Sequence, residues 1–104
     1  MRDDLVAAVE AGEINENSPI DVDILNGPIG GYGFRSGKWP VTIGGVRFKM
    51  YNSIPHQLDL TQQKNTLLES VKTRLANAIK GETYIDKHTG ETHLKYASQM
   101  ERII

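Results

Sequence analysis

The sequence predicts an α+β fold: a small antiparallel sheet with one face covered by a main helix, and short helices near both termini. Two hairpin patterns occur, near residues 41–50 and 83–96, and a long amphipathic pattern covers residues 60–80. The resulting order is helix, strands, helix, hairpin and helix, which is typical of α+β proteins. Because the chain has 104 residues, the usual size of one domain, we expect a single domain over residues 1–104.

The first expected elements are a short helix and a strand. Asp3 or Asp4 is a suitable N-cap, because a carboxylate accepts hydrogen bonds from the free amides of a first helical turn. Residues 20–24 alternate strictly between apolar and acidic side chains. This alternation predicts a half-buried strand whose solvent face carries Asp21 and Asp23.

The most distinct local pattern is a tight hairpin over residues 41–50. Gly44 and Gly45 separate its two strands and supply the positive φ angles that a two-residue primed turn requires. Upstream, residues 32–35 are predicted as a separate short strand, which residues 36–37 interrupt. The alternation of the second hairpin strand gives two opposite sets of side chains: Val46, Phe48 and Met50 on one face, and Arg47, Lys49 and Tyr51 on the other.

The longest expected helix begins after Asp59, which forms a capping-box pattern with Gln62. Gln63 is assigned to its polar face. Downstream, residues 83–96 predict a second hairpin, and residues 97–104 predict a last short helix. The apolar stripe of the long helix recurs at intervals of three and four residues: Leu60, Leu67, Leu68, Val71, Leu75, Ala78 and Ile79.

The composition excludes several classes of protein and site. Without cysteine, the chain cannot form disulfides, thiolate metal sites or a thiol nucleophile. The first residues include Asp3 and Asp4 where a secretion signal needs an apolar core. No apolar run approaches the roughly 20 residues that span a bilayer. We therefore expect a soluble cytoplasmic protein, in its own cell or in a host cell, with no membrane partner.

The charges are sorted into blocks although the net charge is only −1. Residues 1–26 contain seven acidic residues and one basic residue, whereas residues 27–58 contain four basic residues and no acidic one. Residues 59–104 are nearly balanced, with seven basic and six acidic residues. Such blocks create local fields. Two interpretations stay open: the acidic and basic thirds pack together and cancel, or they form separate binding surfaces.

The glycine-rich segment 27–38 resembles known phosphate-binding motifs only superficially. A Walker loop needs glycine and Ser or Thr at the positions of Tyr32 and Trp39, and a dinucleotide fingerprint needs glycine at the position of Ser36. A looser anion cradle of glycine amides and two basic side chains stays open. The simpler interpretation is that these glycines serve tight turns and close backbone contacts.

Residues 30–51 contain five of the seven aromatic residues together with four basic residues and no acidic one. Aromatic and basic side chains interleaved on strands can stack bases and contact phosphates. Exposed aromatic and arginine side chains also anchor protein interfaces. The alternative is that the aromatic residues simply belong to the core. With the two carboxylates of the first strand, the candidate binding residues are Tyr32, Arg35, Lys38, Trp39, Arg47, Lys49, Tyr51, Asp21 and Asp23.

The sequence contains no catalytic constellation. No serine lies in a nucleophile-elbow sequence, and no pair of carboxylates lies in an obviously apolar setting. Asp86, His88, Glu91 and His93 surround one turn, where solvated turn residues are a better explanation than metal ligands. We therefore expect no catalytic residue, no metal and no cofactor, and enzymatic activity has no support.

The main hypothesis is a small non-enzymatic binding protein that acts on a protein partner, including a second copy of the chain whose basic hairpin meets the acidic strand. Small domains without cysteine are common among accessory proteins of phages and mobile elements. The alternative is a binder of nucleic acid or of a nucleotide-like anion through residues 31–51. Against it stand the near-neutral total charge and the acidic strand. A third hypothesis is an enzyme subunit that contributes part of a shared site.

Overall fold

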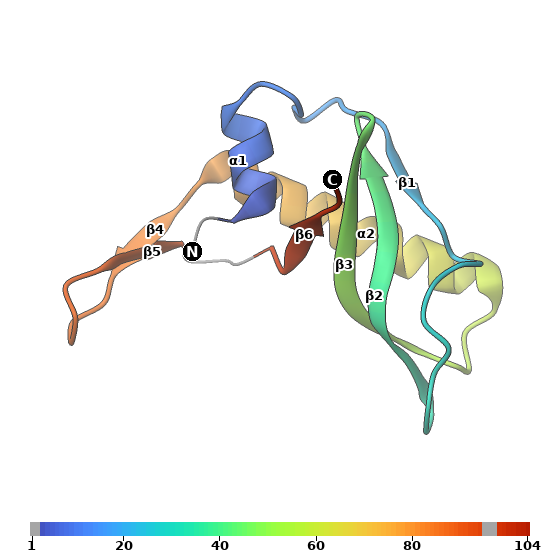
Figure 1. Cartoon of the computed structure of the whole chain (residues 1–104). Helices are drawn as coiled ribbons and strands as arrows, with labels where there is room; N and C mark the ends of the chain where they lie inside the picture. Colours follow the sequence, from blue (N-terminus) through green and yellow to red (C-terminus); the bar gives the residue numbers. More distant parts are fainter. Residues whose placement is uncertain (1–2, 95–97) are drawn as a thin grey trace.

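The computed structural model describes residues 3–94 and 98–104. Within these residues, a four-stranded antiparallel sheet, a separate two-stranded sheet and two helices form an α+β arrangement, which confirms the predicted fold class (Figure 1). In chain order the elements are α1 (Asp4–Glu10), β1 (Ile20–Val22), β2 (Phe34–Ile43), β3 (Val46–Pro55), α2 (Leu60–Lys80), β4 (Thr83–Ile85), β5 (Thr92–Leu94) and β6 (Met100–Arg102).

The main sheet has the strand order β1-β2-β3-β6, with every neighbouring pair antiparallel. Its centre is the predicted hairpin, which turns through Gly44 (φ 55°) and Gly45 (φ 82°). The prediction of a separate strand over residues 32–35 is wrong. Residues 36–37 stay in register with β3 instead of interrupting the chain, so β2 runs without a break from Phe34 to Ile43.

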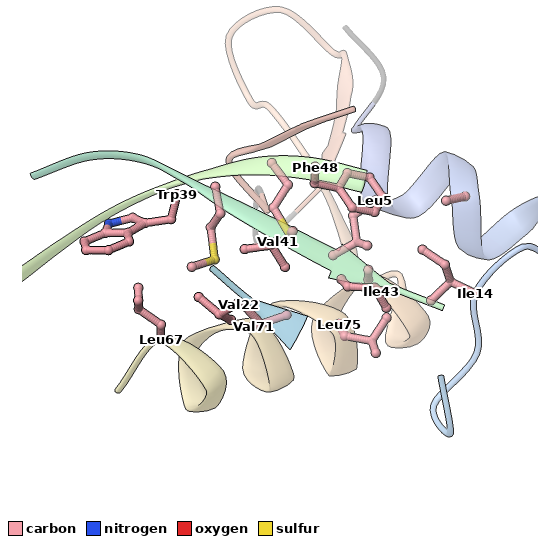
Figure 2. Packing of buried hydrophobic residues seen from close by; sticks show 14 of the residues in the cluster. Leu5, Ile14, Val22, Trp39, Val41, Ile43, Phe48, Leu67, Val71 and Leu75 are labelled. Atoms are coloured by element: carbon pink, nitrogen blue, oxygen red, sulfur yellow. The ribbon is translucent and has the colours of Figure 1, made fainter. Parts of the chain in front are cut away.

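The core lies between the sheet and α2. In Figure 2, apolar side chains of α2 point toward those of β1 and β2. Burying one large apolar side chain stabilises a fold by about 1.5–3 kcal/mol, so this layer is the main source of apolar stabilisation. The buried residues that Figure 2 labels are Leu5, Ile14, Val22, Trp39, Val41, Ile43, Phe48, Leu67, Val71 and Leu75.

α2 begins and ends where the sequence predicts. The side chain of Asp59 accepts a hydrogen bond from the Gln62 amide at 2.8 Å, and the Gln62 side chain accepts one from the Asp59 amide at 3.1 Å. Gly81 ends the helix in the left-handed conformation, with φ 63°. Among the described residues, no helix combines the length and the apolar character needed to cross a membrane.

The apolar stripe of α2 is narrower than predicted. Leu67, Val71, Leu75 and Ala78 are buried, whereas Leu60 and Ile79, at the two ends of the stripe, are exposed and Leu68 is half-buried. The assignment of Gln63 to the polar face is wrong, because its side chain is buried. The Gln63 side chain is directed inward because its Oε1 accepts a hydrogen bond from Arg35.

The predicted helix over residues 97–104 is wrong, because residues 100–102 form strand β6. Met100 pairs in register with Met50, and Glu101 pairs with Lys49. Met100 is buried by this pairing. A helix of two turns is unstable alone, whereas the edge of β3 supplies hydrogen-bond partners for the backbone of residues 100–102. Of the predicted second hairpin, the described part is confirmed, while residues 95 and 96 lie outside the described residues.

α1 is attached to β6 by the acidic side chains that begin it. Asp3 caps the helix, and its two carboxylate oxygens also accept hydrogen bonds from the amide and the hydroxyl of Ser98, both at 2.7 Å. Asp4 accepts one from the Arg102 amide at 2.8 Å. The Arg102 guanidinium donates to Glu13 at 2.6 and 2.8 Å, which lowers the pKa of the Glu13 carboxyl.

The basic third of the chain also forms an ion pair with β6. Lys38 Nζ lies 2.6 Å from Glu101 Oε2, and its hydrogen bond and charge lower the pKa of the Glu101 carboxyl. Together with the Arg102–Glu13 pair, this contact connects each charged third of the chain to the last strand. The acidic and basic thirds also lie side by side, because β1 pairs with residues 41–43 of β2.

The second sheet forms an arm that projects from the body on the side opposite to the β2–β3 hairpin (Figure 1). Its turn is shaped by Asp86, whose carboxylate accepts a hydrogen bond from the His88 amide at 2.8 Å, and by Gly90 with φ 73°. Every strand residue of the arm is exposed except Leu94, which packs partly against the core.

Candidate interaction surface

Residues 24–33, which make up most of the segment between β1 and β2, are here called the tip loop. It accompanies the part of the β2–β3 hairpin that extends beyond β1 and β6 (Figure 1). At its start, Asp23 accepts hydrogen bonds from the amide and the side chain of Asn26 at 3.1 and 2.8 Å, which lower the pKa of the Asp23 carboxyl. At its end, the His56 amide donates to the Gly33 carbonyl at 3.0 Å.

Arg35 holds the middle of the tip loop from inside. Its Nε donates to the Pro28 carbonyl at 2.9 Å and its Nη2 donates to the Ile24 carbonyl at 3.1 Å. Nη1 donates to Gln63 Oε1 at 2.9 Å, and Gln63 Nε2 donates to the Leu58 carbonyl at 2.8 Å. The planar guanidinium meets three acceptors in fixed directions, which a lysine cannot do. This network explains why Gln63 is buried on the inner side of α2.

The tip loop also packs closely against β2, and two of its glycines have no room for a side chain. A Cβ on Gly27 would overlap the Trp39 ring, and a Cβ on Gly30 would overlap the Phe34 carbonyl oxygen. The Trp39 side chain has no exposed surface, and its Nε1 donates to the Asn52 carbonyl at 3.2 Å. These glycines therefore serve close backbone packing, the simpler of the two interpretations of the glycine-rich segment.

The outer side of the same loop exposes large apolar side chains. The exposed fraction is 96% for Ile29 and 105% for Tyr32, and Leu25 is exposed as well. Phe34, at the start of β2, is 49% exposed. Residues 24–34 contain no charged side chain. We call Leu25, Ile29, Tyr32 and Phe34 the tip surface. Exposed apolar side chains on a loop that is fixed from inside are typical of binding sites.

The sheet face opposite α2 forms a second exposed surface, here called the open face. Residues paired across antiparallel strands lie on the same side, so the register places Lys38 beside Tyr51, which is 50% exposed. Lys38 reaches over this face to Glu101. With three cations and two carboxylates, the face has little net charge. It carries more than half of the predicted binding residues: Asp21, Lys38, Arg47, Lys49 and Tyr51.

The remaining predicted binding residues lie elsewhere. Trp39 and Arg35 lie on the inner face, where the Arg35 guanidinium stacks 4.7 Å from the centre of the Trp39 ring. Tyr32 belongs to the tip surface, and Asp23 shapes the turn that begins the tip loop. The predicted binding residues therefore belong to two separate surfaces and to the core. Leu25 and Ile29 were not among them, although large apolar side chains in an uncharged, glycine-rich segment are a usable sign of an exposed loop.

The four side chains considered as metal ligands belong to the arm. His93 Nε2 lies 3.5 Å from Glu91 Oε2, and its ring lies 5.8 Å from that of Tyr84. In residues 3–94 and 98–104, no three histidine or carboxylate side chains come together in a way that could hold a metal ion. Asp86 is used in the turn of the arm.

A cleft of about 1150 Å³ lies between the arm, α1 and β6. Its walls include Asp3 and Asp4 on one side and Tyr84 and His93 on the other. The Asp3 and Asp4 carboxylates already accept hydrogen bonds from the segment that contains β6. These contacts account for Asp3 and Asp4, while Glu91 and Glu101 in the lining lie beside His93 and Lys38.

Comparison with known proteins adds no family to this description. No protein-family model matches the chain, and no curated protein or solved structure matches it significantly. The molecule offers two exposed surfaces for binding: the tip surface is apolar and uncharged, and the open face is mixed in charge.

Proposed function

We propose that the protein is a small non-enzymatic interaction module that binds another protein through the tip surface. The observation that supports this most is a loop that is fixed by partly buried polar contacts and nevertheless exposes Ile29 and Tyr32. Binding by an ordered loop loses less conformational entropy than binding by a disordered one. Tyrosine and other large apolar side chains that enter a partner's pocket supply most of the energy of such interfaces.

The chemistry of the tip surface defines the partner site. Because residues 24–34 carry no charge, the partner offers an apolar, largely uncharged concavity, and the complex is insensitive to salt. This proposal replaces the charge-driven docking expected from the acidic strand. The absence of cysteine suits the reducing interior of a cell, the organism's own or a host's, and an accessory role in a phage or mobile element fits the small size.

The double variant Ile29→Ser/Tyr32→Ser is expected to lose the partner, with affinity reduced at least about ten-fold because both anchors are removed. The test is quantitative affinity capture from lysates, by mass spectrometry, at low and at high salt. Both side chains are exposed, so stability should change by no more than about 0.5 kcal/mol. Arg47→Ala, on the open face, is the matched control and should retain the same proteins.

The proposal fails if the double variant retains the same proteins as the unchanged chain, or if the Arg47→Ala control loses them equally. Self-association is measured by light scattering on the purified chain. If a second copy is the partner, the oligomer should persist in high salt and disappear in the double variant.

A second candidate function is binding of single-stranded nucleic acid by the open face. The observation in its favour is the position of Tyr51 beside Lys38, with Arg47 and Lys49 on the same uncovered face. Base stacking on an aromatic side chain contributes about 1–3 kcal/mol. The carboxylates of Asp21 and Glu101 on this face weaken attraction to phosphates, so we rank this function below protein binding.

For this second function, Tyr51→Ala is expected to weaken binding of a labelled oligothymidine by about 5- to 100-fold, measured by fluorescence anisotropy. Binding should also weaken steeply as salt is raised. Intrinsic fluorescence of Trp39 is an unsuitable reporter because the ring is buried. Lys64→Ala, on the exposed side of α2, is the control and should leave affinity unchanged. The absence of any anisotropy change at low salt would remove this candidate.

A further inference from the structure

The two edges of the main sheet differ in how their backbone hydrogen-bonding groups are satisfied. At the β6 edge these groups are covered. An uncovered strand edge is a template for pairing with another chain, and proteins commonly block it. Here Ser98 donates its amide to Asp3, and Arg102 donates its amide to Asp4. Between them, the Met100 amide donates to the Ser98 hydroxyl at 3.3 Å. Side chains therefore satisfy the outward amides of this edge in succession.

The opposite edge, along β2, is covered only in part. β1 pairs with residues 41–43, and the Asp23 amide then donates to the Pro40 carbonyl at 3.0 Å. Alternate residues of an antiparallel strand direct their backbone groups to the same edge. The backbone carbonyl of Pro40 points toward β1, so the backbone amides and carbonyls of Lys38 and Ser36 point to this same edge of β2. Within the described part of the chain, their backbone amides and carbonyls have no hydrogen-bond partner on this edge.

The side chains at this edge leave it accessible. A charged residue on an edge strand usually discourages pairing. However, the Lys38 side chain extends across the open face, away from the edge, and forms an ion pair with Glu101 there. The Ser36 hydroxyl is bonded to the Ser53 hydroxyl, again across the sheet. Ser36 and Lys38 are both exposed.

We infer that the partner of the tip surface contributes an extended segment that adds to β2 as a new strand, in line with β1. This inference rests on the proposed function and specifies its mode of recognition. Ser36 and Lys38 offer two donors and two acceptors at strand spacing, which an extended polypeptide backbone matches. The segment pairs with residues 36–38 only, because Gly30 of the tip loop lies against the Phe34 carbonyl on the same edge and Asp23 occupies the edge at Pro40. Because Lys38 is already paired, the segment needs no charge.

The probe is a library of phage-displayed random peptides of about twelve residues, selected on the unchanged chain. Peptides that bind should slow hydrogen exchange of the Ser36 and Lys38 amides at least about ten-fold, measured by NMR on the chain. Ser36→Pro, which removes one edge donor, should lower their affinity at least about ten-fold, whereas Ser36→Ala should stay within about two-fold. Pro40 shows that β2 accepts proline at a position of this orientation.

The outcomes separate this inference from the proposed function. Peptides whose binding is lost in Ile29→Ser/Tyr32→Ser, but which neither protect the two amides nor respond to Ser36→Pro, would overturn strand addition and leave the tip surface as the binding site. Peptides that protect the two amides and bind the tip variant normally would support the edge and contradict the proposed function. If no peptide is selected, strand addition is overturned, whereas the proposed function is decided by the affinity capture described above, because a short peptide offers no concavity for the tip surface.

Discussion

Replacing Trp39 with alanine is expected to lower the free energy of unfolding by about 3–5 kcal/mol, a large share of the roughly 5–15 kcal/mol that stabilises a typical domain. The indole has no exposed surface, lies above Leu67 in Figure 2 and stacks on the Arg35 guanidinium. Its removal leaves a cavity beneath the tip loop that neither strand can fill. The measurement is equilibrium unfolding in urea, followed by circular dichroism because the variant lacks the fluorophore.

Trp39→Phe is the graded control. It keeps an aromatic ring but leaves the Asn52 carbonyl without its 3.2 Å donor, which costs about 1–3 kcal/mol. Its stability should therefore lie between those of the unchanged chain and Trp39→Ala. A loss below about 1 kcal/mol for Trp39→Ala would show that the ring does not support the core as described.

Gly27→Ala is expected to destabilise the fold by about 1–3 kcal/mol and to displace the tip loop. The added methyl group would overlap the Trp39 ring, which cannot retreat because it is fully buried. The loop must therefore move outward, which strains the hydrogen bonds from Arg35 to Ile24 and Pro28. Urea unfolding measures the loss of stability, and faster hydrogen exchange in residues 24–33 reports the displacement.

Gly31→Ala is the matched control in the same loop. A Cβ at this position has no neighbour within 4 Å, and its φ lies outside the left-handed range. The substitution should leave stability unchanged or raise it by up to about 1 kcal/mol, because alanine restricts the unfolded chain. Equal losses for Gly27→Ala and Gly31→Ala would contradict the packing argument.

Local patterns predicted the elements that depend on local chemistry. The cap of α2 and the glycine turn of the β2–β3 hairpin follow from side chains within a few residues of one another. β6 was missed because its pairing with β3 joins distant segments, such as Met100 and Met50. Gln63 was misassigned for the same reason, since only the folded chain brings Arg35 to it.

The candidate site could be predicted only in part. Extending the alternation of Val41 and Ile43 backward through Pro40 places Trp39 on the inner face, so its burial was available from the sequence. The exposure of Ile29 and Tyr32 was not, because it depends on how Arg35 and the glycines fix the tip loop. Apolar side chains in a loop fold inward or outward according to contacts that the local sequence does not contain.

The attachment of α1 to β6 has a consequence for folding kinetics. The β2–β3 hairpin closes through a two-residue turn, a local event on the microsecond scale. In contrast, Asp3 and Ser98 are 95 positions apart, and Asp4 and Arg102 are 98 apart. Closing so long a loop reduces the conformational entropy of the chain before these hydrogen bonds can form. We therefore expect their formation to be a late step in folding. On this basis we expect the main sheet to be completed last, at its β6 edge, after the β2–β3 hairpin has formed.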